Sequence, residues 1–258
     1  MSYRRTLFAA LLSLTITSSY AVAGQPLSTE DAGVVERGHL EIEVNGTIMK
    51  DRETIDGSLK KKSSSLLETK LSTGINSDTG IAMILPYTIT AHDNGVASDG
   101  FGDITLELKK YLGDFSGVHL AVKPSVTLAT GADRISEHHT QLGGTLIASK
   151  NLLNDVVALH LNLGVRHATY AEDDGSKNRT IWSSSVAIEG DASKNLTLAA
   201  EIGNSRKESD TDNHNPAFAM VGGRYAVTEM VSLSAGVRMG LTTNEDDIRL
   251  LYGMIVRF

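Results

Sequence analysis

The sequence of 258 residues contains no cysteine, no long apolar run and few aromatic side chains, which make up 5% of it. Without cysteine the fold must hold together without disulfides, as a closed ring of hydrogen-bonded strands does. Beyond the first residues, no segment reaches the roughly 18 consecutive apolar residues of a membrane-spanning helix. The net charge of −7 argues against the basic surface that nucleic acids require, so we expect no nucleic-acid partner.

Enzyme motifs are also missing. The chain has no G-x-S-x-G, no H-E-x-x-H, no P-loop and no dinucleotide-binding glycine pattern. Two alternatives remain open. His138 and His139 could bind a metal from a loop, and His167 beside Ser184 or Ser185 could cleave lipid at the outer rim. We predict a protein that is not an enzyme and that uses no cofactor and no metal.

The first residues resemble an export signal. Arg4 and Arg5 form a basic start, and the apolar stretch Thr6–Ile16 is too short to span a membrane. Ala21-Val22-Ala23 then supplies a small-x-small cleavage pattern. This arrangement predicts a signal peptide over residues 1–23 and a mature chain that begins near Gly24.

Apolar side chains recur at every second position along most of the remaining chain, a period that marks strands with one apolar face. Most of these segments have the roughly nine to eleven residues that a tilted strand needs to cross a bilayer. The period predicts strands over Gly38–Met49, Ser63–Gly74, Gly80–Thr88, Gly102–Tyr111, Val118–Thr130, Gln141–Lys150, Val156–Ala168, Thr180–Glu189, Leu196–Gly203, Ala217–Ala226, Val231–Leu241 and Ile248–Phe258.

The connections between these strands alternate in length. Long polar loops are expected at Lys50–Lys62, Ile89–Phe101, Gly131–Thr140, Thr169–Arg179, Asn204–Pro216 and Thr242–Asp247. The connections between them, such as Leu112–Gly117 and Asn151–Asp155, are short. Long outer loops and short periplasmic turns are the pattern of an outer-membrane barrel, and an even number of strands leaves both chain ends on the periplasmic side.

The segment Val156–Ala168 shows the two faces of such a strand, because its valines and leucines alternate with His160, Asn162 and Arg166. Lipid cannot solvate charge, so the apolar face points outward and the polar face lines the lumen. We predict an all-β fold, a closed antiparallel transmembrane β-barrel of about twelve strands. Pro124 falls inside a predicted strand and lacks an N–H group, so we expect a bulge or a register shift there.

Several stretches carry a resemblance to a known family. They are GQPLSTEDAGVVERGHLEIEV (Gly24–Val44), FGDITLELKKYL (Phe101–Leu112), VKPSVTLATG (Val122–Gly131), VVALHLNLGVRH (Val156–His167) and GGRYAVTEMVSLSAGVRMGLTTNEDD (Gly222–Asp247). Over essentially the whole mature chain, the sequence resembles the MetA-pathway phenol-degradation family of outer-membrane transporters. The resemblance implies a twelve-stranded barrel that passes small, often aromatic, molecules, and it implies no catalytic residues. The family name reflects a pathway and does not identify the substrate.

The alternation places one set of charged side chains in the lumen: Glu41, Glu43, Glu68, Lys70, Glu107, Lys109, Lys123, His160, Arg166, Glu189, Glu201, Arg224, Arg238, Arg249 and Arg257. Opposite charges that pair across the lumen would brace the wall, whereas a charged constriction would filter solutes. The last three predicted strands carry Arg224, Arg238, Arg249 and Arg257, and the first two carry Glu41, Glu43 and Glu68. This separation of charge predicts an electric field across the lumen. In a closed barrel these strands also meet, so some of the charges could pair there.

Four apolar side chains fall on the same inward face: Phe218, Met220, Leu251 and Ile255. Barrels of about eight strands are filled and those of about sixteen are open, so twelve strands predict a narrow bore. An apolar strip in a polar bore would suit an amphipathic or aromatic solute. The alternative is that these side chains fill space beneath a plug. We hypothesise that Phe218 and Met220 line the solute path.

Residues 24–37 precede the first strand. Ser28 and Asp31 have the spacing of a capping box, which predicts a short helical turn. We hypothesise that this segment lies in or near the periplasmic mouth and restricts flow. A loose periplasmic tail is the alternative.

The predicted function is that of an outer-membrane transporter or channel, in which small amphipathic or aromatic solutes diffuse through a narrow, charge-lined lumen. The alternative is a structural or surface-interaction barrel without flux. The expected partners are outer-membrane lipid and lipopolysaccharide, the solute, and the barrel-assembly machinery. We expect that machinery to recognise the last strand, in which apolar residues alternate and which ends on Phe258.

Overall fold

The computed structural model describes residues 25–55, 58–93, 96–169, 178–208 and 214–258. The predicted signal peptide lies outside the described residues, as does Gly24. Among the described residues, no helix is long and apolar enough to cross a membrane. The strands in these ranges are β1 (Leu40–Ile55), β2 (Ser58–Asn76), β3 (Thr79–Asp93), β4 (Val96–Phe101), β5 (Ile104–Phe115), β6 (Val118–Leu128), β7 (Thr140–Leu152), β8 (Val157–Thr169), β9 (Thr180–Ser193), β10 (Leu196–Ser205), β11 (Ala217–Ala226), β12 (Val231–Gly240) and β13 (Ile248–Arg257).

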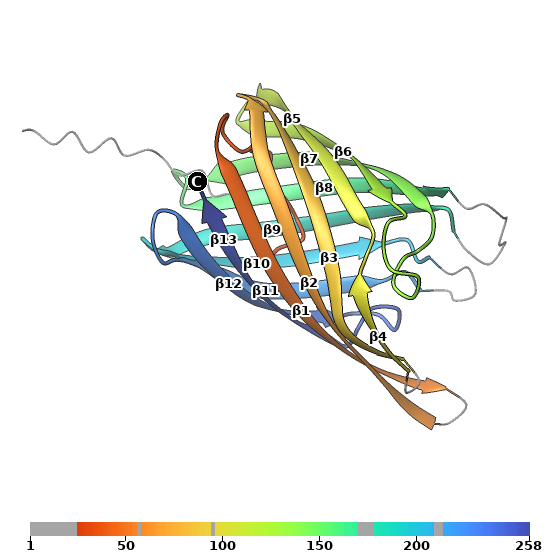
Figure 1. Ribbon diagram of the computed structural model, residues 1–258. Coiled ribbons are helices and arrows are strands. Elements are labelled where there is room, and N and C mark those ends of the chain that lie inside the picture. The colour runs from red at the N-terminus through yellow and green to blue at the C-terminus, as the bar shows by residue number, and fades with distance from the viewer. Residues whose placement is uncertain (1–24, 56–57, 94–95, 170–177, 209–213) are drawn as a thin grey trace, which may run out of the picture.

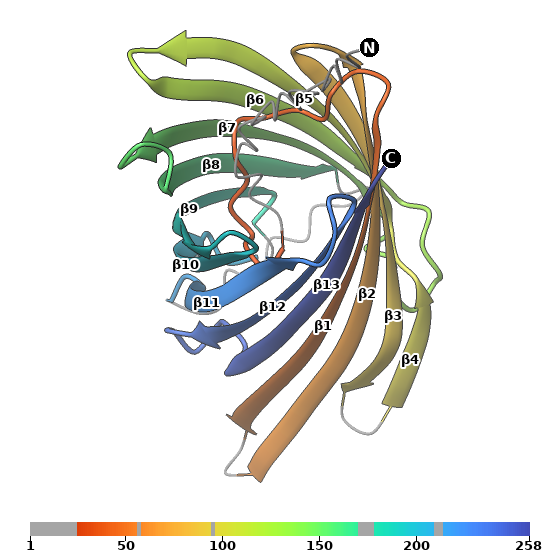
Figure 2. The same cartoon turned by 90° about the vertical axis from the view of Figure 1, so that its left-hand side faces the viewer.

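The strands close into one antiparallel ring (Figure 1, Figure 2). The ring is sealed where β1 pairs with β13, from Glu41 opposite Arg257 to Lys50 opposite Ile248. One part of β3 pairs with β5 and the other part with β4, so β4 and β5 share one position in the wall. The predicted closed barrel of twelve strands is therefore confirmed, with its fourth strand divided into β4 and β5.

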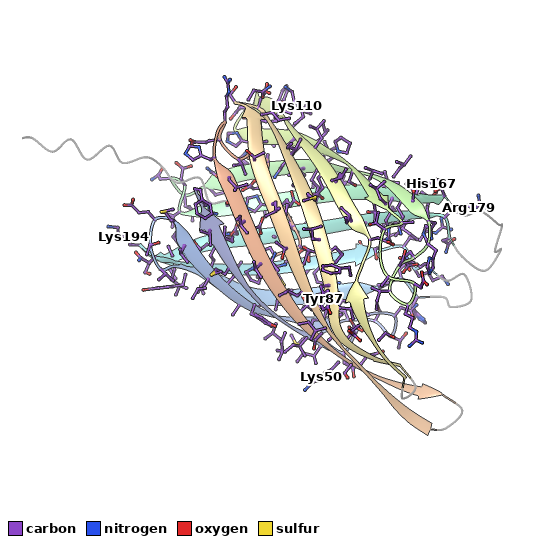
Figure 3. The ribbon with its side chains drawn as sticks, viewed as in Figure 1. Lys50, Tyr87, Lys110, His167, Arg179 and Lys194 are labelled. Atoms are coloured by element: carbon purple, nitrogen blue, oxygen red, sulfur yellow. The ribbon has the colours of Figure 1, made fainter. Side chains whose placement is uncertain are left out.

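The wall has an apolar outer face and a polar inner face. On β8, Leu163 is 46% exposed on the outside, whereas His160 is 1% exposed in the lumen. Figure 3 shows charged side chains at the ends of the barrel, with Lys194 toward the end that carries the C-terminus and Arg179 toward the other end. The period of two predicted these faces because successive side chains of a strand point in opposite directions.

Two of the predicted long loops are wrong, because the strands continue through them as hairpins. The β1–β2 ladder extends to Ile55 opposite Ser58, and the β3–β4 ladder extends to Asp93 opposite Val96. In Figure 1 the β1–β2 hairpin projects beyond the rest of the barrel. Outside the bilayer both faces of a strand are in water, so these polar segments have no apolar period to mark them.

Pro124 interrupts the hydrogen-bond ladder but does not shift it. Pairing of β5 with β6 stops after Glu107 and resumes at Lys110 in the same register. The predicted bulge or register shift at Pro124 is therefore wrong, and the shift in this ladder lies between Tyr111 and Gly113. Proline has no N–H group to donate, and the ladder accommodates it by omitting the pairs at this point while the register is kept.

Residues 25–37 run inside the barrel along its inner wall (Figure 2). At one end, Pro26 packs against Gly222 of β11 and Gly236 of β12, where a Cβ atom would clash with its ring. At the other end, Arg37 forms a bridge with Gly74 of β2. We call residues 25–37 the lumen segment, because it crosses the interior from the last strands of the barrel to the first.

Candidate functional site

The lumen segment begins with an apolar contact. Leu27 is buried in a cluster with Phe218 and Met220 of β11, together with Ala187 and Leu251 from neighbouring parts of the wall. A second cluster buries Ala32 of the segment with two wall residues, Ala121 and Ile147. Apolar side chains on the inner face thus pack against the segment.

Glu201 of β10 holds the next two residues. Its carboxylate accepts hydrogen bonds from the Ser28 N–H group and from the Thr29 hydroxyl, both at 2.8 Å. Thr29 Oγ1 also lies 2.7 Å from Ser185 Oγ of β9. The predicted helical turn is wrong, because residues 28–32 contain no helix. In a capping box, a side chain of the segment itself would accept the Ser28 N–H group. Here Glu201 of the wall accepts it instead.

Glu30 forms the centre of a charged cluster. Its carboxylate lies 2.5 Å from Lys123 Nζ, 3.4 Å from Lys70 Nζ and 3.3 Å from Lys109 Nζ. Glu107 lies 2.7 Å from Lys123 and 3.4 Å from Lys70. Three strands, β2, β5 and β6, therefore supply the lysines that hold one glutamate of the lumen segment.

A buried polar chain holds the segment a little further along. The Ala32 N–H group donates to Ser149 Oγ at 2.9 Å, and this oxygen lies 2.8 Å from His160 Nδ1. The other ring nitrogen of His160 lies 3.0 Å from Glu189, which also pairs with Arg224 at 3.3 Å. The chain of contacts thus connects the backbone of the segment to charges on β9 and β11.

The connection between β12 and β13 folds inward at the mouth of the barrel opposite the end that carries the C-terminus. Glu245, whose side chain is 5% exposed, lies 2.8 Å from Arg238 and 3.0 Å from Arg249. The Arg238 guanidinium also stacks on the Phe218 ring, 3.4 Å from its centroid. Glu245 of the connection therefore joins two arginines and one aromatic ring of the wall at this mouth.

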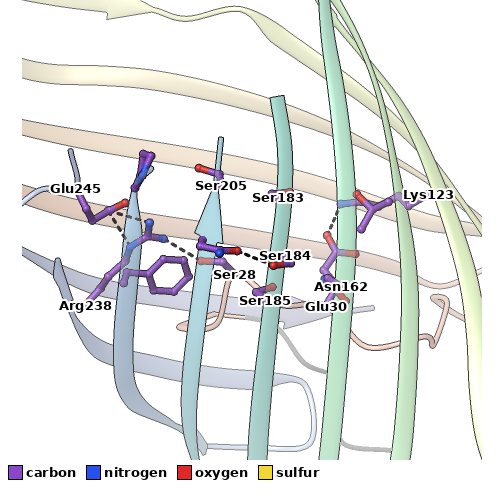
Figure 4. A pocket seen from close by; sticks show the side chains of 14 residues that line it. Ser28, Glu30, Lys123, Asn162, Ser183, Ser184, Ser185, Ser205, Arg238 and Glu245 are labelled. Carbon is purple, nitrogen blue, oxygen red and sulfur yellow. Dashed lines mark hydrogen bonds and ion pairs between the residues drawn. The ribbon is translucent and has the colours of Figure 1, made fainter. Parts of the chain in front are cut away.

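A cavity of about 260 Å³ lies between this mouth and the lumen segment (Figure 4). Arg238 lies on one side of it, and Lys123 and Glu30 lie on the other. Phe218, on which Arg238 stacks, also lines the cavity. Hydroxyl and amide groups form much of the remaining lining, contributed by Ser28, Thr145, Asn162, Ser183, Ser185 and Asn204. The cavity thus offers many neutral polar groups, paired charges and one aromatic ring.

Asp103 orders another loop near the junction of β4 and β5. Its carboxylate accepts bonds from the N–H groups of Thr130, Gly131 and Glu137 and from the Ser136 hydroxyl, at 2.7–2.9 Å. Partial burial raises the pKa of this carboxyl, but the bonds from Ser136 and the three N–H groups outweigh it and hold the pKa below its ordinary value. Residues 130–137 are thereby clamped to the wall.

Most of the charged residues predicted for the lumen are paired in the structure. Arg257 lies 2.7 Å from Glu41 across the β1–β13 seam, and Arg166 pairs with Glu208 and bonds Gln141 at 3.0 Å. Glu107, Lys109 and Lys123 belong to the cluster around Glu30. His160 and Arg224 contact Glu189, and Arg238 and Arg249 contact Glu245. Because most of these charges have an opposite charge close by, the pairing weakens any electric field across the lumen.

The other predicted residues occupy different positions. Glu43 and Glu68 form no ion pair with another described residue, although Glu43 is buried. Phe218 borders the cavity and the lumen segment, whereas Met220 is 1% exposed beneath Leu27. The arrangement of Met220 matches the alternative of space filled beneath a plug, and its role in a solute path stays a prediction.

Sequence reasoning missed the wall-binding residues of the lumen segment. Glu30 was assigned no partner, and the capping-box interpretation directed attention to Ser28 and Asp31 instead. Charge balance gave no signal for Glu30, because the same inner face that carries Lys70, Lys109 and Lys123 also carries Glu68 and Glu107, and Glu43 lies directly opposite Lys70. The inward fold of Glu245 had no signal in the sequence, since an acidic loop is normally solvated.

Solved structures share this fold. The COG4313 outer membrane channel from Pseudomonas putida F1 matches with a TM-score of 0.75 and 15% identity, covering 90% of this chain and 100% of that one. The KdgM porin in complex with disordered oligogalacturonate matches at 0.60 and 11%, covering 84% and 99%. The NanC porin matches at 0.59 and 10%, covering 83% and 98%. The three are described as a channel and two porins, and at these identities they show the fold alone, that of outer-membrane β-barrels.

No curated protein matches the chain. The family comparison is decisive, because the family model described as "Putative MetA-pathway of phenol degradation" matches residues 23–258. This range covers every strand of the barrel and the whole lumen segment. The chain therefore belongs to this family.

Proposed function

We propose that this protein is an outer-membrane channel through which a small amphipathic or aromatic solute crosses by diffusion. The cavity of about 260 Å³ is the observation that carries the proposal. The Phe218 ring offers an apolar contact there, and the hydroxyls of Ser183 and Ser185 offer hydrogen bonds. Drug-sized ligands occupy pockets of about 300–1,000 Å³, so the cavity suits a smaller solute. The likeness to a channel and to porins supports passage through the lumen.

The location and the partners are part of the same proposal. The signal peptide directs export and is removed, and the apolar outer face contacts outer-membrane lipid, with lipopolysaccharide in the outer leaflet. The exposed ring of Phe258 follows directly after β13, at the end where the barrel-assembly machinery would bind the last strand. The supporting observation is the apolar outer wall, on which Leu163 and Val165 of β8 and Leu233 of β12 are exposed.

Liposome swelling with a panel of small solutes tests the proposal. Ser183→Trp places a large side chain in the cavity, so we expect it to slow the permeation of every solute several-fold. Val186→Trp is the matched control, because Val186 lies on the outer face of the same strand and is already exposed. Equal permeation through the two variants would contradict a path through the cavity.

The alternative, a structural or surface-interaction barrel, is favoured by how completely the lumen segment is bound to the wall. Planar-bilayer recordings separate the two functions. If the native barrel conducts no ions and takes up no solute, and loosening the segment also opens no current, the protein is a barrel without flux. Any solute-dependent swelling of liposomes by the native protein supports the channel.

A further inference from the structure

Three hydroxyl side chains form one row across the inner wall of the cavity. Thr145 of β7 lies opposite Gly164 of β8, and Gly164 in turn lies opposite Ser183 of β9. Ser183 lies opposite Ser205 of β10 (Figure 4). Facing residues of paired strands share one face of the sheet, and all three hydroxyl residues line the cavity. Neighbouring strands are about 4.8 Å apart, so this hydroxyl row extends over roughly 14 Å.

The hydroxyl row is available to a solute. Its three side chains form no hydrogen bond with another described residue, whereas Ser185 of the same cavity lies 2.7 Å from the Thr29 hydroxyl of the lumen segment. A hydroxyl group has one donor and two acceptor positions, which bind water when no solute is present. The row can therefore exchange its water for the hydroxyl groups of a solute without breaking any contact within the protein.

The charged side chains that line the cavity are paired with one another. Lys123 lies 2.5 Å from Glu30, and Arg238 lies 2.8 Å from Glu245. The two positive and two negative charges of the lining therefore balance. A charged solute that enters loses part of its water shell, and the lining offers no unpaired opposite charge to replace it. A neutral solute avoids this cost, because hydroxyl groups replace the water that it gives up.

The apolar part of the lining is small. The Phe218 side chain is buried, and the Arg238 guanidinium stacks on its ring. The ring also packs closely over Gly203 of β10, where a Cβ atom would lie 2.6 Å from it. Pro216 is the other lining residue without a polar side chain. The cavity thus favours a mainly polar solute that turns one apolar side toward Phe218.

We propose that the solute of this channel is an uncharged molecule with several hydroxyl groups, about the size of a single sugar ring. Its hydroxyl groups bind the row formed by Thr145, Ser183 and Ser205, and its C–H side faces Phe218. The cavity of about 260 Å³ is below the size of drug-sized pockets, which agrees with one ring. This assignment rests on the proposed channel function and narrows its amphipathic solute to a neutral, polyhydroxylated class.

Tracer uptake into liposomes that contain the full barrel tests the assignment. Glucose, gluconate and glucosamine share a six-carbon skeleton, and at about pH 6 they are neutral, negative and positive. With no membrane potential, glucose should enter about tenfold faster than either charged form, because only the charged forms lose uncompensated hydration. The potential of the protein surface would slow one charged form and speed the other. Slower entry of both therefore identifies exclusion by the cavity.

Alanine variants test the hydroxyl row itself. Ser183→Ala and Ser205→Ala each remove one hydroxyl without narrowing the cavity. The glucose concentration that half-saturates uptake should rise about fivefold in each, the effect of one lost neutral hydrogen bond. Ser232→Ala is the matched control, because Ser232 is buried on the inner face of β12 and does not line the cavity. An unchanged half-saturating concentration in both row variants would overturn the role of the row.

A charged variant gives a readout that does not depend on how much protein inserts. Ser205→Asp adds an unpaired carboxylate to the row, so the ratio of glucosamine to gluconate entry should rise about tenfold. An unchanged ratio would mean that solutes do not pass the row. If all three solutes enter the native barrel equally fast, or a charged form enters fastest, the channel stands and the assignment fails. If none enters, both proposals fail.

Discussion

The two halves of the lumen segment are bound to the wall by different forces. Leu27 packs among apolar side chains, whereas Glu30 is surrounded by three lysines from β2, β5 and β6. Apolar burial is non-directional and tolerates small displacements, but a buried carboxylate that leaves its lysines exposes several uncompensated charges at once. From this comparison we expect loss of the charged contacts to detach the segment and loss of the apolar contacts to lower the stability of the barrel.

Glu30→Lys should have the largest effect, because it places a fourth cation among Lys70, Lys109 and Lys123. Breaking a buried ion pair costs about 3–5 kcal/mol, so we expect the charged half to leave the wall and the single-channel conductance to rise several-fold. Glu36→Lys is the control, since it makes the same charge change in the same segment at an exposed side chain. Equal conductance of the two variants would mean that the lysines do not hold the segment.

Leu27→Ala should have the second-largest effect, and on a different quantity. The loss of a buried leucine costs about 2–5 kcal/mol, so the barrel should unfold at a lower temperature, as measured by its heat-dependent mobility in gels. The conductance should change less than in Glu30→Lys, because the charged half stays bound. Val34→Ala, in a half-buried position of the same segment, is the control. A conductance increase as large as that of Glu30→Lys would remove the distinction between the halves.

Asp103→Asn should have the smallest effect on stability. It compares Glu30, which is held by lysines inside the lumen, with an acidic group outside the lumen that is held by neutral donors. Asp103 is held by hydrogen bonds alone, so its neutral amide should weaken the clamp by about 1 kcal/mol and speed tryptic cleavage after Arg134 a few-fold. Asp99→Asn, at an exposed position, is the control. Cleavage at the same rate in both variants would show that Asp103 does not order the loop.

The same carboxyl predicts a pH dependence in the unmodified protein. Because its pKa is lower in the folded state than in the unfolded one, its contribution to stability is complete above its ordinary pKa. That contribution is lost as the pH falls through the lowered value. The loop should therefore resist an acid protease until the pH is below about 4, and Asp103→Asn should show no such threshold.

The barrel itself was predictable because the membrane imposes a period. The outward leucines of β8 and the inward His160 follow from alternation alone, and the same argument located all twelve positions of the wall. It failed on the outer parts of β1 and β2, where no lipid requires an apolar face. A solvated strand and a polar loop have similar compositions, so only the observed ladder distinguishes them.

The interior was less predictable because alternation says which face a side chain occupies but not what it meets. Alternation places Arg238 in the lumen, but its partner Glu245 comes from a connection that folds back inside. Glu30 comes from a segment with no period at all, and its partners lie on strands 40 or more residues away. Such contacts depend on three-dimensional closure, which no local pattern encodes.

The seam between the first and last strands has a consequence for assembly. The backbone of Leu40 exchanges hydrogen bonds with that of Phe258, so the N–H and C=O groups along the facing edges of β1 and β13 reach their partners in the wall only when these two strands meet. Residues 25–37 precede β1 and occupy the interior of the finished cylinder. Once the two edges have met, the interior that these residues occupy is enclosed by the wall on every side.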